Sequence, residues 1–344
     1  MIDDAISTLE ADGTLDEALS YGAFAQIMTG GAEEARITRL LSLLARRPVT
    51  VDELTGAARV MREHVEPVPV AQDVRDTIID TCGTGGAPKA FNVSTVAALI
   101  AAGAGRRTGR PVRVAKHGNR SRTGRGSAEV LIELGVNAEA SPAVQARCLE
   151  EAGVCFCFAI HHHPAIRHAM PSRRALDHPT IYNLLGPMTN PAGSRRQLIG
   201  CFDAGALGTM TRALERLGAE RAMVCRGDDG LDEITTTTTT TAFVLDGDGV
   251  RKETIDASAM GVPRATLADL QVADVAESAR VVRGILEGDT GARTDIAIVN
   301  AGAALVVGGA VGDLGAGVEL AREAVRSGRA LMALDELARV SRSA

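Results

Sequence analysis

Short apolar segments rich in β-branched residues recur along the chain from residue 77 onward, and a glycine-rich or polar stretch follows most of them. These segments occupy residues 77–81, 112–115, 155–160, 222–225 and 297–299. Strands that alternate with helical patterns are typical of a doubly wound α/β fold with a mainly parallel central sheet. Ligands bind such sheets beyond the carboxyl ends of the strands, so we expect the functional site in the polar loops.

The first 66 residues follow a different pattern and contain no segment with the features of a strand. Apolar residues recur at spacings of three and four through 15–28, 35–44 and 51–61, which predicts three helices. Thr50 directly precedes the third of these and is a suitable helix cap. Two prolines within 66–76 indicate a linker between this unit and the rest of the chain.

These two patterns divide the chain into unequal parts. We predict a small all-helical domain over residues 1–72 and a larger α/β domain over residues 73–344. With 344 residues, 45% of them hydrophobic, the chain is long enough for a large buried core.

Charge and cysteine content restrict the function classes. The formal net charge is −6, so a globally basic surface is absent and we expect no nucleic-acid partner. The six cysteines form no CxxC pair and are expected to be reduced thiols. The acidic start does not have the pattern of a signal peptide, and the longest apolar run, residues 93–105, is too short to span a bilayer. We therefore expect a cytoplasmic protein without a membrane partner.

Two polar loops have the composition of phosphate-binding sites. Gly83-Thr-Gly-Gly86 precedes the expected helix start at Asn92-Val-Ser-Thr95, where glycines and free backbone N–H groups favour anions. The same residues are also compatible with a tight turn and ordinary helix caps. The second loop, Lys116-His-Gly-Asn-Arg-Ser121, gathers five hydrogen-bonding side chains around one glycine. It fits a polyanion site better than a solvated basic loop.

Two further segments contain candidate ligands for metal or carboxylate. His161-His-His-Pro164 is followed by Arg167, Arg173 and Arg174; three neighbouring histidines on an extended segment cannot all ligate one metal ion. One histidine with a nearby arginine would instead suit an aromatic carboxylate. Asp232 and Glu233, in a glycine-containing turn, are plausible magnesium ligands, although acidic turns are common. The threonine run 235–241 favours an exposed strand.

Taken together, these motifs resemble the anthranilate phosphoribosyltransferase family over nearly the whole chain. The most specific of them are KHGNRS and NLLGPMTNP in this order, and GTGG, FNVST, HHPAIRHAMPSRRAL, GDDGLDEIT and NAGAAL agree with them. The resemblance implies a helical domain on an α/β domain of the nucleoside phosphorylase/phosphoribosyltransferase type. It also implies that a segment near 172–195 returns to the helical domain, and that the chain forms a homodimer through this domain.

The implied reaction transfers the 5-phosphoribosyl group from phosphoribosyl pyrophosphate (PRPP) to the amine of anthranilate, in tryptophan biosynthesis, with Mg²⁺ as cofactor. Each site residue follows from a motif match. The residues implied to bind PRPP are Gly83, Gly85, Gly86, Asn92, Ser94, Thr95, Lys116 and Ser127. Those implied for the acceptor are Gly83, His117, Asn119, His163 and Arg173, and those implied for magnesium are Ser94, Asp232 and Glu233.

The chain departs from the family pattern near the phosphate-handling segments. Ala87 stands where the family has an acid, the loop 122–127 is shorter, 106–111 is an insertion, and Pro179 replaces an arginine. These differences leave open a related phosphoribosyltransferase that uses a different aromatic acceptor in specialised metabolism. A pyrimidine nucleoside phosphorylase ranks lower because that family lacks KHGNR. The acidic charge and the Asp232–Glu233 pair oppose a non-catalytic, nucleic-acid-binding relative.

Overall fold

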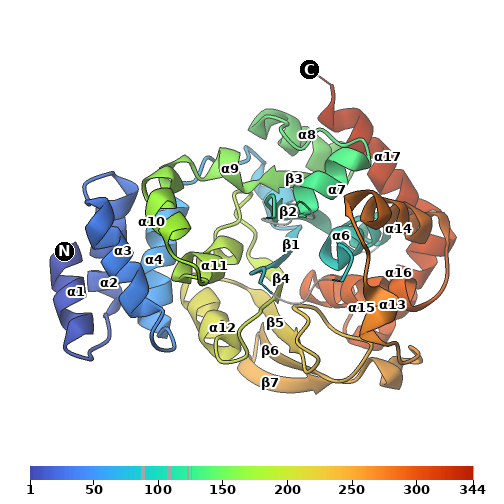
Figure 1. Ribbon diagram of the computed structural model, residues 1–344. Helices are drawn as coiled ribbons and strands as arrows, with labels where there is room; N and C mark the ends of the chain where they lie inside the picture. The colour runs from blue at the N-terminus through green and yellow to red at the C-terminus, as the bar shows by residue number, and fades with distance from the viewer. Residues whose placement is uncertain (87–89, 107–110, 122–123, 125, 344) are drawn as a thin grey trace.

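The computed structural model describes residues 1–86, 90–106, 111–121, 124 and 126–343, and it contains a helical part beside a layered α/β part (Figure 1). The helical part begins with α1 (Ile2–Glu10), α2 (Glu17–Met28), α3 (Glu34–Leu44) and α4 (Val51–Glu63). Thr50 caps α4 as predicted: its side chain accepts the Glu53 N–H, and the Glu53 side chain accepts the Thr50 N–H. The linker is extended except for the short helix α5 (Gln72–Arg75).

The α/β part is built on one seven-stranded sheet in the order β3-β2-β1-β4-β5-β6-β7. Its strands are β1 (Ile78–Gly83), β2 (Arg113–Gly118), β3 (Val154–Phe158), β4 (Arg196–Gly200), β5 (Arg221–Gly227), β6 (Thr240–Asp246) and β7 (Gly249–Ile255). The first five strands are parallel, and β6 and β7 are antiparallel to their neighbours. The predicted fold class, a mainly parallel doubly wound sheet with a helical N-terminal domain, is confirmed.

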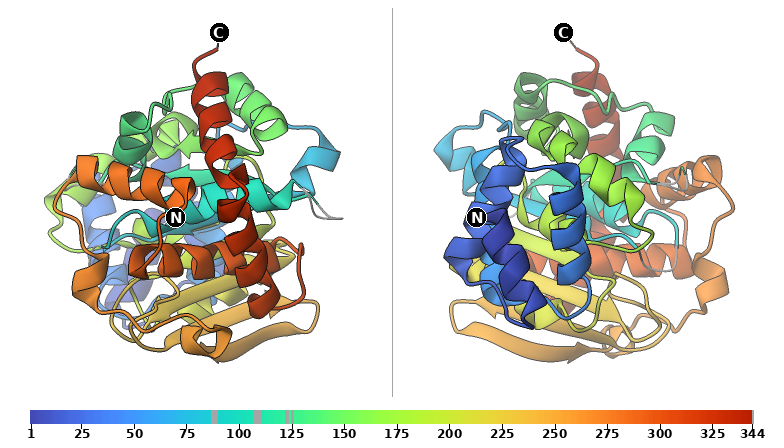
Figure 2. Two further views of the ribbon diagram at one scale, coloured as in Figure 1. Left: turned by 90° about the vertical axis from the view of Figure 1, so that its right-hand side faces the viewer. Right: turned by 60° about the vertical axis from the view of Figure 1, so that its left-hand side comes forward.

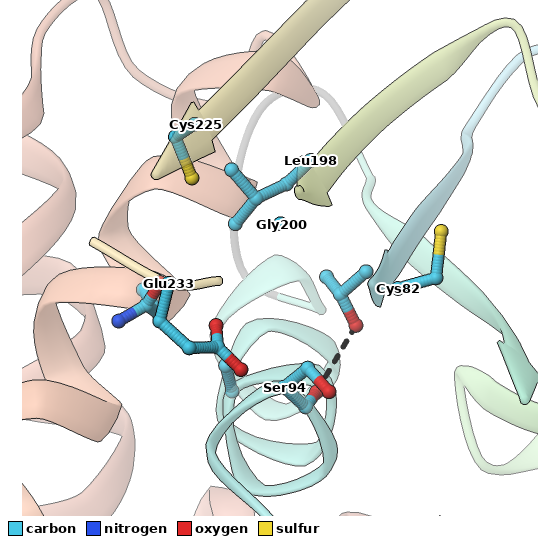
Figure 3. Close-up of a pocket in the computed structure, with 9 residues that line it drawn as sticks. Cys82, Ser94, Leu198, Gly200, Cys225 and Glu233 are labelled. Carbon is cyan, nitrogen blue, oxygen red and sulfur yellow. Dashed lines mark hydrogen bonds between the residues drawn. The ribbon is translucent and has the colours of Figure 1, made fainter. Parts of the chain in front are cut away.

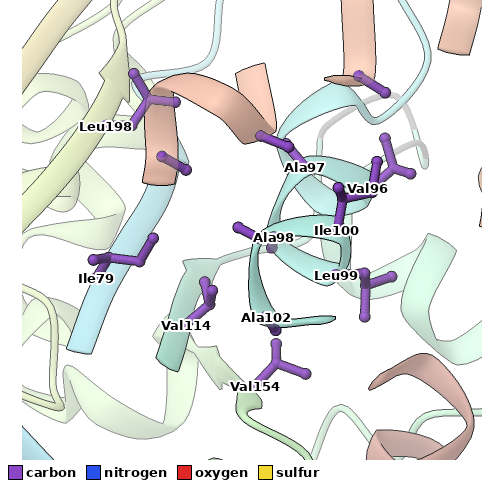
Figure 4. Close-up of a cluster of buried hydrophobic side chains, with 14 of the residues drawn as sticks. Ile79, Val96, Ala97, Ala98, Leu99, Ile100, Ala102, Val114, Val154 and Leu198 are labelled. Carbon is purple, nitrogen blue, oxygen red and sulfur yellow. The ribbon is translucent and has the colours of Figure 1, made fainter. Parts of the chain in front are cut away.

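One face of the sheet packs on α6 (Val93–Gly105), which is buried along nearly its whole length. Figure 4 shows Ile79, Val114 and Leu198 of three strands facing the small side chains of this helix. Further helices surround α6 and close this side of the molecule (Figures 1 and 2). They are α7 (Ser127–Glu133), α8 (Pro142–Glu151), α14 (Val275–Glu287), α15 (Ala292–Val307), α16 (Leu314–Arg326) and α17 (Arg329–Ser341).

The other face of the sheet packs on α12 (Leu207–Arg216) and, through it, on the helical part. The segment between β3 and β4 contributes to this second core. It contains α9 (Ala159–His162), α10 (Met170–Ala175) and α11 (Ile181–Leu185), and the Ser172 hydroxyl donates to the Glu34 carbonyl across 3.1 Å. The α10–α11 segment therefore packs beside α3 and α4, while the exact domain division at residue 72 remains a prediction.

Residues 297–299, expected to form a strand, lie instead within α15, so this prediction was wrong. A short run of apolar residues cannot distinguish a buried strand from a buried helix, because both are apolar on every side. Here α15 is buried on nearly all sides against α6 and α16. The expected strand at 155–160 also ends early, at Phe158, and residues 159–162 are helical rather than extended.

The threonine run 235–241 is not an exposed strand, which corrects that expectation. Residues 235–239 are irregular, with bends at 236–238, and β6 begins only at Thr240. The Thr235 hydroxyl donates to Asp229 Oδ2 across 2.6 Å, and the Thr237 hydroxyl donates to the same oxygen. Threonines here satisfy a carboxylate in the preceding turn, a side-chain interaction that strand propensity does not include.

None of the helices in the described residues combines the length and the apolar character that crossing a membrane requires.

A pair of glycines allows α15 and α16 to cross closely. A methyl group at Gly317 would lie 2.5 Å from the Gly302 carbonyl oxygen, and one at Gly302 would lie 2.8 Å from the Val318 nitrogen. These contacts involve helix backbone, which cannot move without separating two buried helices.

We therefore expect Gly317→Ala to lower the free energy of unfolding by about 1–3 kcal/mol, as overpacking of a core does. Gly315→Ala is the matched control, because it lies in the same helix and its new methyl group would meet only the Asp313 side chain, at 3.3 Å. Urea unfolding of both variants measures the difference. Equal stabilities would show that the crossing does not need a glycine.

Candidate active site

Five parallel strands end at one edge of the sheet, and their carboxyl ends carry most of the predicted site residues. At the end of β1, Gly83 is followed by Gly85 and Gly86, which have φ angles of 66° and 95° that favour glycine. The Thr84 N–H donates to the Gly200 carbonyl across 2.9 Å, and the Thr84 hydroxyl accepts the Phe202 N–H. The glycine turn is thus fixed against the end of β4. Ala87 lies outside the described residues.

Helix α6 begins directly after Asn92, and its first turn faces this edge. Asn92 is held by Ser278 of α14: the Ser278 hydroxyl donates to Asn92 Oδ1 across 2.8 Å and accepts the Asn92 N–H. The Ser94 hydroxyl accepts from Lys116 across 3.1 Å. Thr95 is buried, and its hydroxyl has no hydrogen-bond partner among the described residues. The structure therefore places Ser94 in direct contact with Lys116 of the basic motif.

We expected a loop at Lys116-His-Gly, but these residues complete β2, and the loop starts at Asn119. Lys116 is consequently buried. Its ammonium group donates to the Thr81 carbonyl across 2.8 Å as well as to Ser94. Burial lowers the pKa of Lys116, and the nearby carboxylates of Asp80, Glu233 and Asp232 oppose this effect.

Asp80 is a buried site residue that the sequence reasoning missed. Its Oδ1 accepts the backbone N–H of His117 across 3.0 Å, and it lies close enough to Lys116 for the two charges to interact. Burial raises the pKa of Asp80, and Asn190, the His117 N–H and Lys116 act against that rise. A carboxylate within an otherwise apolar, β-branched segment was the available signal, because such a residue is rarely buried without a partner.

His117 and His163 form a buried pair. Their Nε2 atoms are 3.2 Å apart and the ring planes are tilted by 47°. Burial lowers the pKa of both, that of His163 to about 4, so neither is charged at neutral pH. His162 points elsewhere and contacts the Glu66 carbonyl and Gln145. Of these neighbouring histidines, His163 therefore lies in the candidate site, whereas His162 has a structural role.

Three further predicted residues lie at the margin of this arrangement. Arg173, on α10, lies 5.1 Å from the centroid of the Tyr182 ring. Asn119 is exposed at the end of β2, and Ser127 begins α7 close to Gly118. Residues 122, 123 and 125 lie outside the described part of the chain, as do 107–110 of the expected insertion. Pro179 is exposed, directly before α11.

The acidic turn after β5 returns to the same edge. A methyl group on Gly83 would lie 3.0 Å from Asp232 Oδ2, and one on Gly200 would collide with the Asp232 carbonyl. Asn300 of α15 holds the turn: it accepts the Ile234 N–H across 3.0 Å and donates to the Ile234 carbonyl. The glycines thus allow the acidic turn to approach β1 and β4, and Asn300 fixes it there.

The small pocket between these elements is lined by Thr81, Cys82, Ser94, Ala97, Leu198, Gly200, Cys225, Glu233 and Asn300. Figure 3 shows the Glu233 carboxylate pointing toward Ser94 at the start of α6. Burial and the charge of Asp232 raise the pKa of Glu233 to about 8. The neutral form of Glu233 is therefore favoured at neutral pH, and a cation bound beside the two carboxyl groups would favour its ionisation.

The donor set fits magnesium in part. Among the described residues no three His, Cys, Asp or Glu side chains gather as a metal cluster. Asp232, Glu233 and the Ser94 hydroxyl supply oxygen ligands, and magnesium is commonly bound by one or two carboxylates together with substrate phosphates. The residues therefore suit an ion that is held jointly by protein and substrate.

The comparison with known proteins agrees with this arrangement. Residues 75–331 match the α/β domain of a glycosyl transferase family, and residues 3–65 match its helical bundle domain. The anthranilate phosphoribosyltransferase of Rubrobacter xylanophilus is 45% identical, covering 99% of this chain and 98% of the relative. That of Methanosphaerula palustris is 41% identical over 99% of each. The chain belongs to the anthranilate phosphoribosyltransferase family.

Solved structures of this family have the same fold. The crystal structure from Thermus thermophilus, 37% identical, covers 99% of this chain and 100% of that chain with a TM-score of 0.90. A structure from Saccharomyces cerevisiae in complex with PRPP and Mg has a TM-score of 0.86 over 99% of this chain and 97% of its own. At 20% identity, the second likeness establishes the fold alone. The family resemblance is confirmed, and the individual residue roles stay predictions.

The neutral histidine pair predicts a specific loss of stability in acid. An unfolded histidine titrates near pH 6.5 and folded His163 near 4, so between these values the unfolded chain binds the additional proton. The free energy of unfolding should therefore fall as the pH falls through this window. From pH 7.5 to 5 the contribution of His163 is about 2 kcal/mol.

Chemical unfolding at both pH values tests this expectation with His163→Gln, which should lose less stability in acid than the native chain does. His178→Gln, at an exposed histidine, is the control and should retain the native acid sensitivity. Identical acid losses in the native chain and His163→Gln would show that His163 can be protonated without disturbing the fold.

Proposed function

We infer that this chain transfers the 5-phosphoribosyl group of PRPP to the amine of anthranilate and releases pyrophosphate, a reaction of tryptophan biosynthesis. The observation that carries this inference is the convergence of Lys116, Ser94, Asp232 and Glu233 at one edge of the sheet. A cation and two carboxylates around a helix start fit a pyrophosphate with its counterion. The family membership of the whole chain supports the same reaction.

PRPP is proposed to occupy the region between the glycine turn and the first turn of α6. The left-handed conformations of Gly85 and Gly86 and the free N–H groups at the start of the helix suit phosphate oxygens. Lys116 would direct its ammonium group at the phosphates, and Ser127 and Thr95 would contribute hydroxyl groups. Asn92 would act through the helix start, since Ser278 already holds its side-chain oxygen.

In the reaction the bond between C1 of the ribose and the pyrophosphate oxygen breaks, and the amine nitrogen forms the new bond to C1. The nitrogen then loses one proton. Positive charge develops on the ribose while negative charge grows on the leaving pyrophosphate. Lys116, already fixed by Thr81 and Ser94, would stabilise that negative charge without reorganising.

The acceptor is proposed to lie between the histidine pair and the α10–α11 segment. His117 and His163 are neutral, so they offer hydrogen bonds or ring contacts to an aromatic amine without attracting a second cation. Arg173 would bind the anthranilate carboxylate, and Asn119 and Gly83 would complete the contacts. An aromatic amine is neutral at pH 7, so correct placement against C1 supplies much of the catalysis, and no general base is assigned.

Mg²⁺ is the proposed cofactor, held by Asp232, Glu233 and the Ser94 hydroxyl together with substrate oxygens. When bound, it would neutralise charge on the pyrophosphate. The protein fixes the position of the acidic turn through Asn300. Burial and Asp232 oppose the ionisation of Glu233, and a bound cation would favour it. The chain is further proposed to act in the cytoplasm as a homodimer that associates through its helical part.

The comparisons do not favour the alternative of a different aromatic acceptor, because three relatives that are 39–45% identical over at least 99% of this chain are named anthranilate phosphoribosyltransferase. A non-catalytic role in nucleic-acid binding is likewise not favoured.

The direct test is to follow anthranilate fluorescence with purified protein, PRPP and magnesium. We expect anthranilate to be consumed only when PRPP and magnesium are both present. Reactions that lack either one are the controls. Turnover of another aminobenzoate, with none of anthranilate, would instead assign the chain to the specialised relative.

A second prediction separates a metal site from an acidic turn. Replacing Asp232 with Asn and Glu233 with Gln in one variant should lower kcat/KM for PRPP at least about tenfold, or roughly 1.4 kcal/mol. Two negative charges are lost from the cation site, so higher magnesium should restore part of the activity. Steady-state kinetics across a magnesium series measures both effects.

Asp228→Asn is the matched control, because this exposed carboxylate belongs to the same turn and contacts Thr239. It should retain native kinetics. Native rates in the Asp232–Glu233 double variant at low millimolar magnesium would contradict the assignment of these residues as ligands.

A further inference from the structure

A second cavity lies near the amino-terminal ends of the parallel strands, on the opposite side of the sheet from their carboxyl ends and the candidate active site. Its volume is about 180 Å³, smaller than the roughly 300–1,000 Å³ of sites for drug-sized ligands. The lining residues are Arg62, Val65, Pro67, Arg75, Asn190, Pro191, Ala192, Gly193, Ser194, Arg195, Leu217, Gly218 and Ala219. They come from the end of α4, the linker, the segment that enters β4, and the loop after α12. A small ligand would therefore contact four separate parts of the chain.

The charges around this cavity are of one sign. Three arginines line it, and none of its lining residues is acidic. Arg195 is paired with Glu220, at 3.0 Å, just outside the cavity. Arg62 and Arg75 form no ion pair among the described residues, so their positive charges are not neutralised by a neighbouring carboxylate.

Arg62 is the more informative of the two because it is half-buried. Its Nε donates to the Met188 carbonyl across 2.8 Å and its Nη1 donates to the Leu217 carbonyl across 2.9 Å. These neutral acceptors orient the guanidinium but do not compensate its charge. Burial lowers its pKa to about 10, and Arg59 adds to this effect. A partly desolvated cation beside an open cavity is costly, and a bound anion would compensate it.

Arg75 lies at the mouth of the cavity, on the linker. Its Cδ and Nε would be 3.7 and 3.8 Å from a methyl group on Gly193, so its side chain extends along the turn before β4. Gly193 has a φ angle of 68°, which favours glycine at this turn. The remaining wall is largely apolar, with Val65, Pro191 and Leu217. A charged end and an apolar wall suit a small organic anion.

We propose that this cavity binds a small organic anion, a carboxylate or phosphate attached to a compact apolar group, between Arg62 and Arg75. The guanidinium groups match the oxygens of either anion, and the apolar wall covers the body of the ligand. The proposal does not depend on the catalytic reaction, because none of the residues assigned to that site lines this cavity.

The position of the cavity gives its occupant a mechanical role. The linker leads from the helical part to β1, and residues 190–195 lead from α11 back to β4, so both connections form its walls. The Val68 N–H donates to the Pro191 carbonyl across 3.0 Å, which joins them directly. Asn190 donates to the Ala115 carbonyl, next to Lys116 on β2. An anion held here would restrain the connection between the two parts and would lie beside Asn190, which contacts the strand that carries Lys116.

The binding test uses inorganic phosphate and 4-bromobenzoate as probes in calorimetric titrations of the full chain. Arg75→Glu should weaken one binding event at least tenfold, because an attractive charge becomes repulsive. Arg75 is exposed, so this variant should fold. Arg326→Glu is the matched control: it makes the same charge change on exposed surface of α16 and should leave that event unchanged. Binding at the catalytic site should not respond to either change and provides an internal reference.

Each outcome decides the proposal. Loss of phosphate binding in Arg75→Glu supports it and identifies a phosphate ligand, and loss of bromobenzoate binding supports it and identifies a carboxylate. Crystals soaked in bromobenzoate should show bromine anomalous density in the cavity of the native chain and not in Arg75→Glu. Equal affinities in Arg75→Glu and Arg326→Glu for both probes, or bromine density only at the catalytic site, would overturn the anion site.

Hydrogen exchange tests the mechanical role separately. A bound probe should slow amide exchange over residues 66–76 and 190–195 in the native chain and in Arg326→Glu, and should not change it in Arg75→Glu. Binding of a probe in the cavity without slower exchange in these segments would overturn the restraint on the connection.

Discussion

The ammonium group of Lys116 lies where β1, β2 and α6 meet, and the site is arranged around this buried cation. An isolated charge at this depth would be too costly, so its surroundings must supply partners. The Thr81 carbonyl and the Ser94 hydroxyl accept its hydrogen bonds, and Asp80, Asp232 and Glu233 supply opposite charge. The requirement to compensate one cation therefore links the first strand, the second strand, the start of α6 and the acidic turn.

Close backbone approaches make this arrangement possible. Gly83 and Gly200 lie against Asp232, so the acidic turn reaches a depth that side chains at these positions would prevent. Asn300, on a helix far along the chain, then fixes the turn through both backbone groups of Ile234. Glycines also allow a close backbone approach at the crossing of α15 and α16, where Gly302 and Gly317 meet. Small residues thus determine how close the charged groups lie.

The two ends of the parallel strands differ in the charges that gather there. At the carboxyl ends of the strands, carboxylates and Lys116 balance one another, and a phosphate with its cation would complete the balance. At the amino-terminal ends, Arg62 and Arg75 have no carboxylate partner within the described part of the chain, and they line a cavity that the linker and residues 190–195 enclose. The segments that connect the helical and α/β parts line this second cavity, so a ligand there would contact the connection between them.

Local patterns in the sequence determined much of the architecture. Spacing and residue type within a few positions predicted the cap at Thr50, the three helices between residues 15 and 63, and the strands that begin near 77, 112 and 222. They also predicted the glycine turn at 83–86. The order of KHGNRS and NLLGPMTNP indicated the family, because that combination is specific. The polar stretches at the ends of these strands also indicated the edge of the sheet at which the candidate site lies.

Only the tertiary structure decided which residues meet. Residues 297–299 are helical, within α15, which is buried on nearly all sides. The apolar residues of such a helix show no 3.6-residue periodicity, so the sequence pattern alone does not distinguish it from a buried strand. Asn92 is held by Ser278, 186 positions away, and Asp80 acquires its role from the amide of His117 on the next strand. Such contacts depend on strand order and helix packing. Local sequence determined most of the elements, whereas the partners of buried charges follow from long-range packing that no short pattern contains.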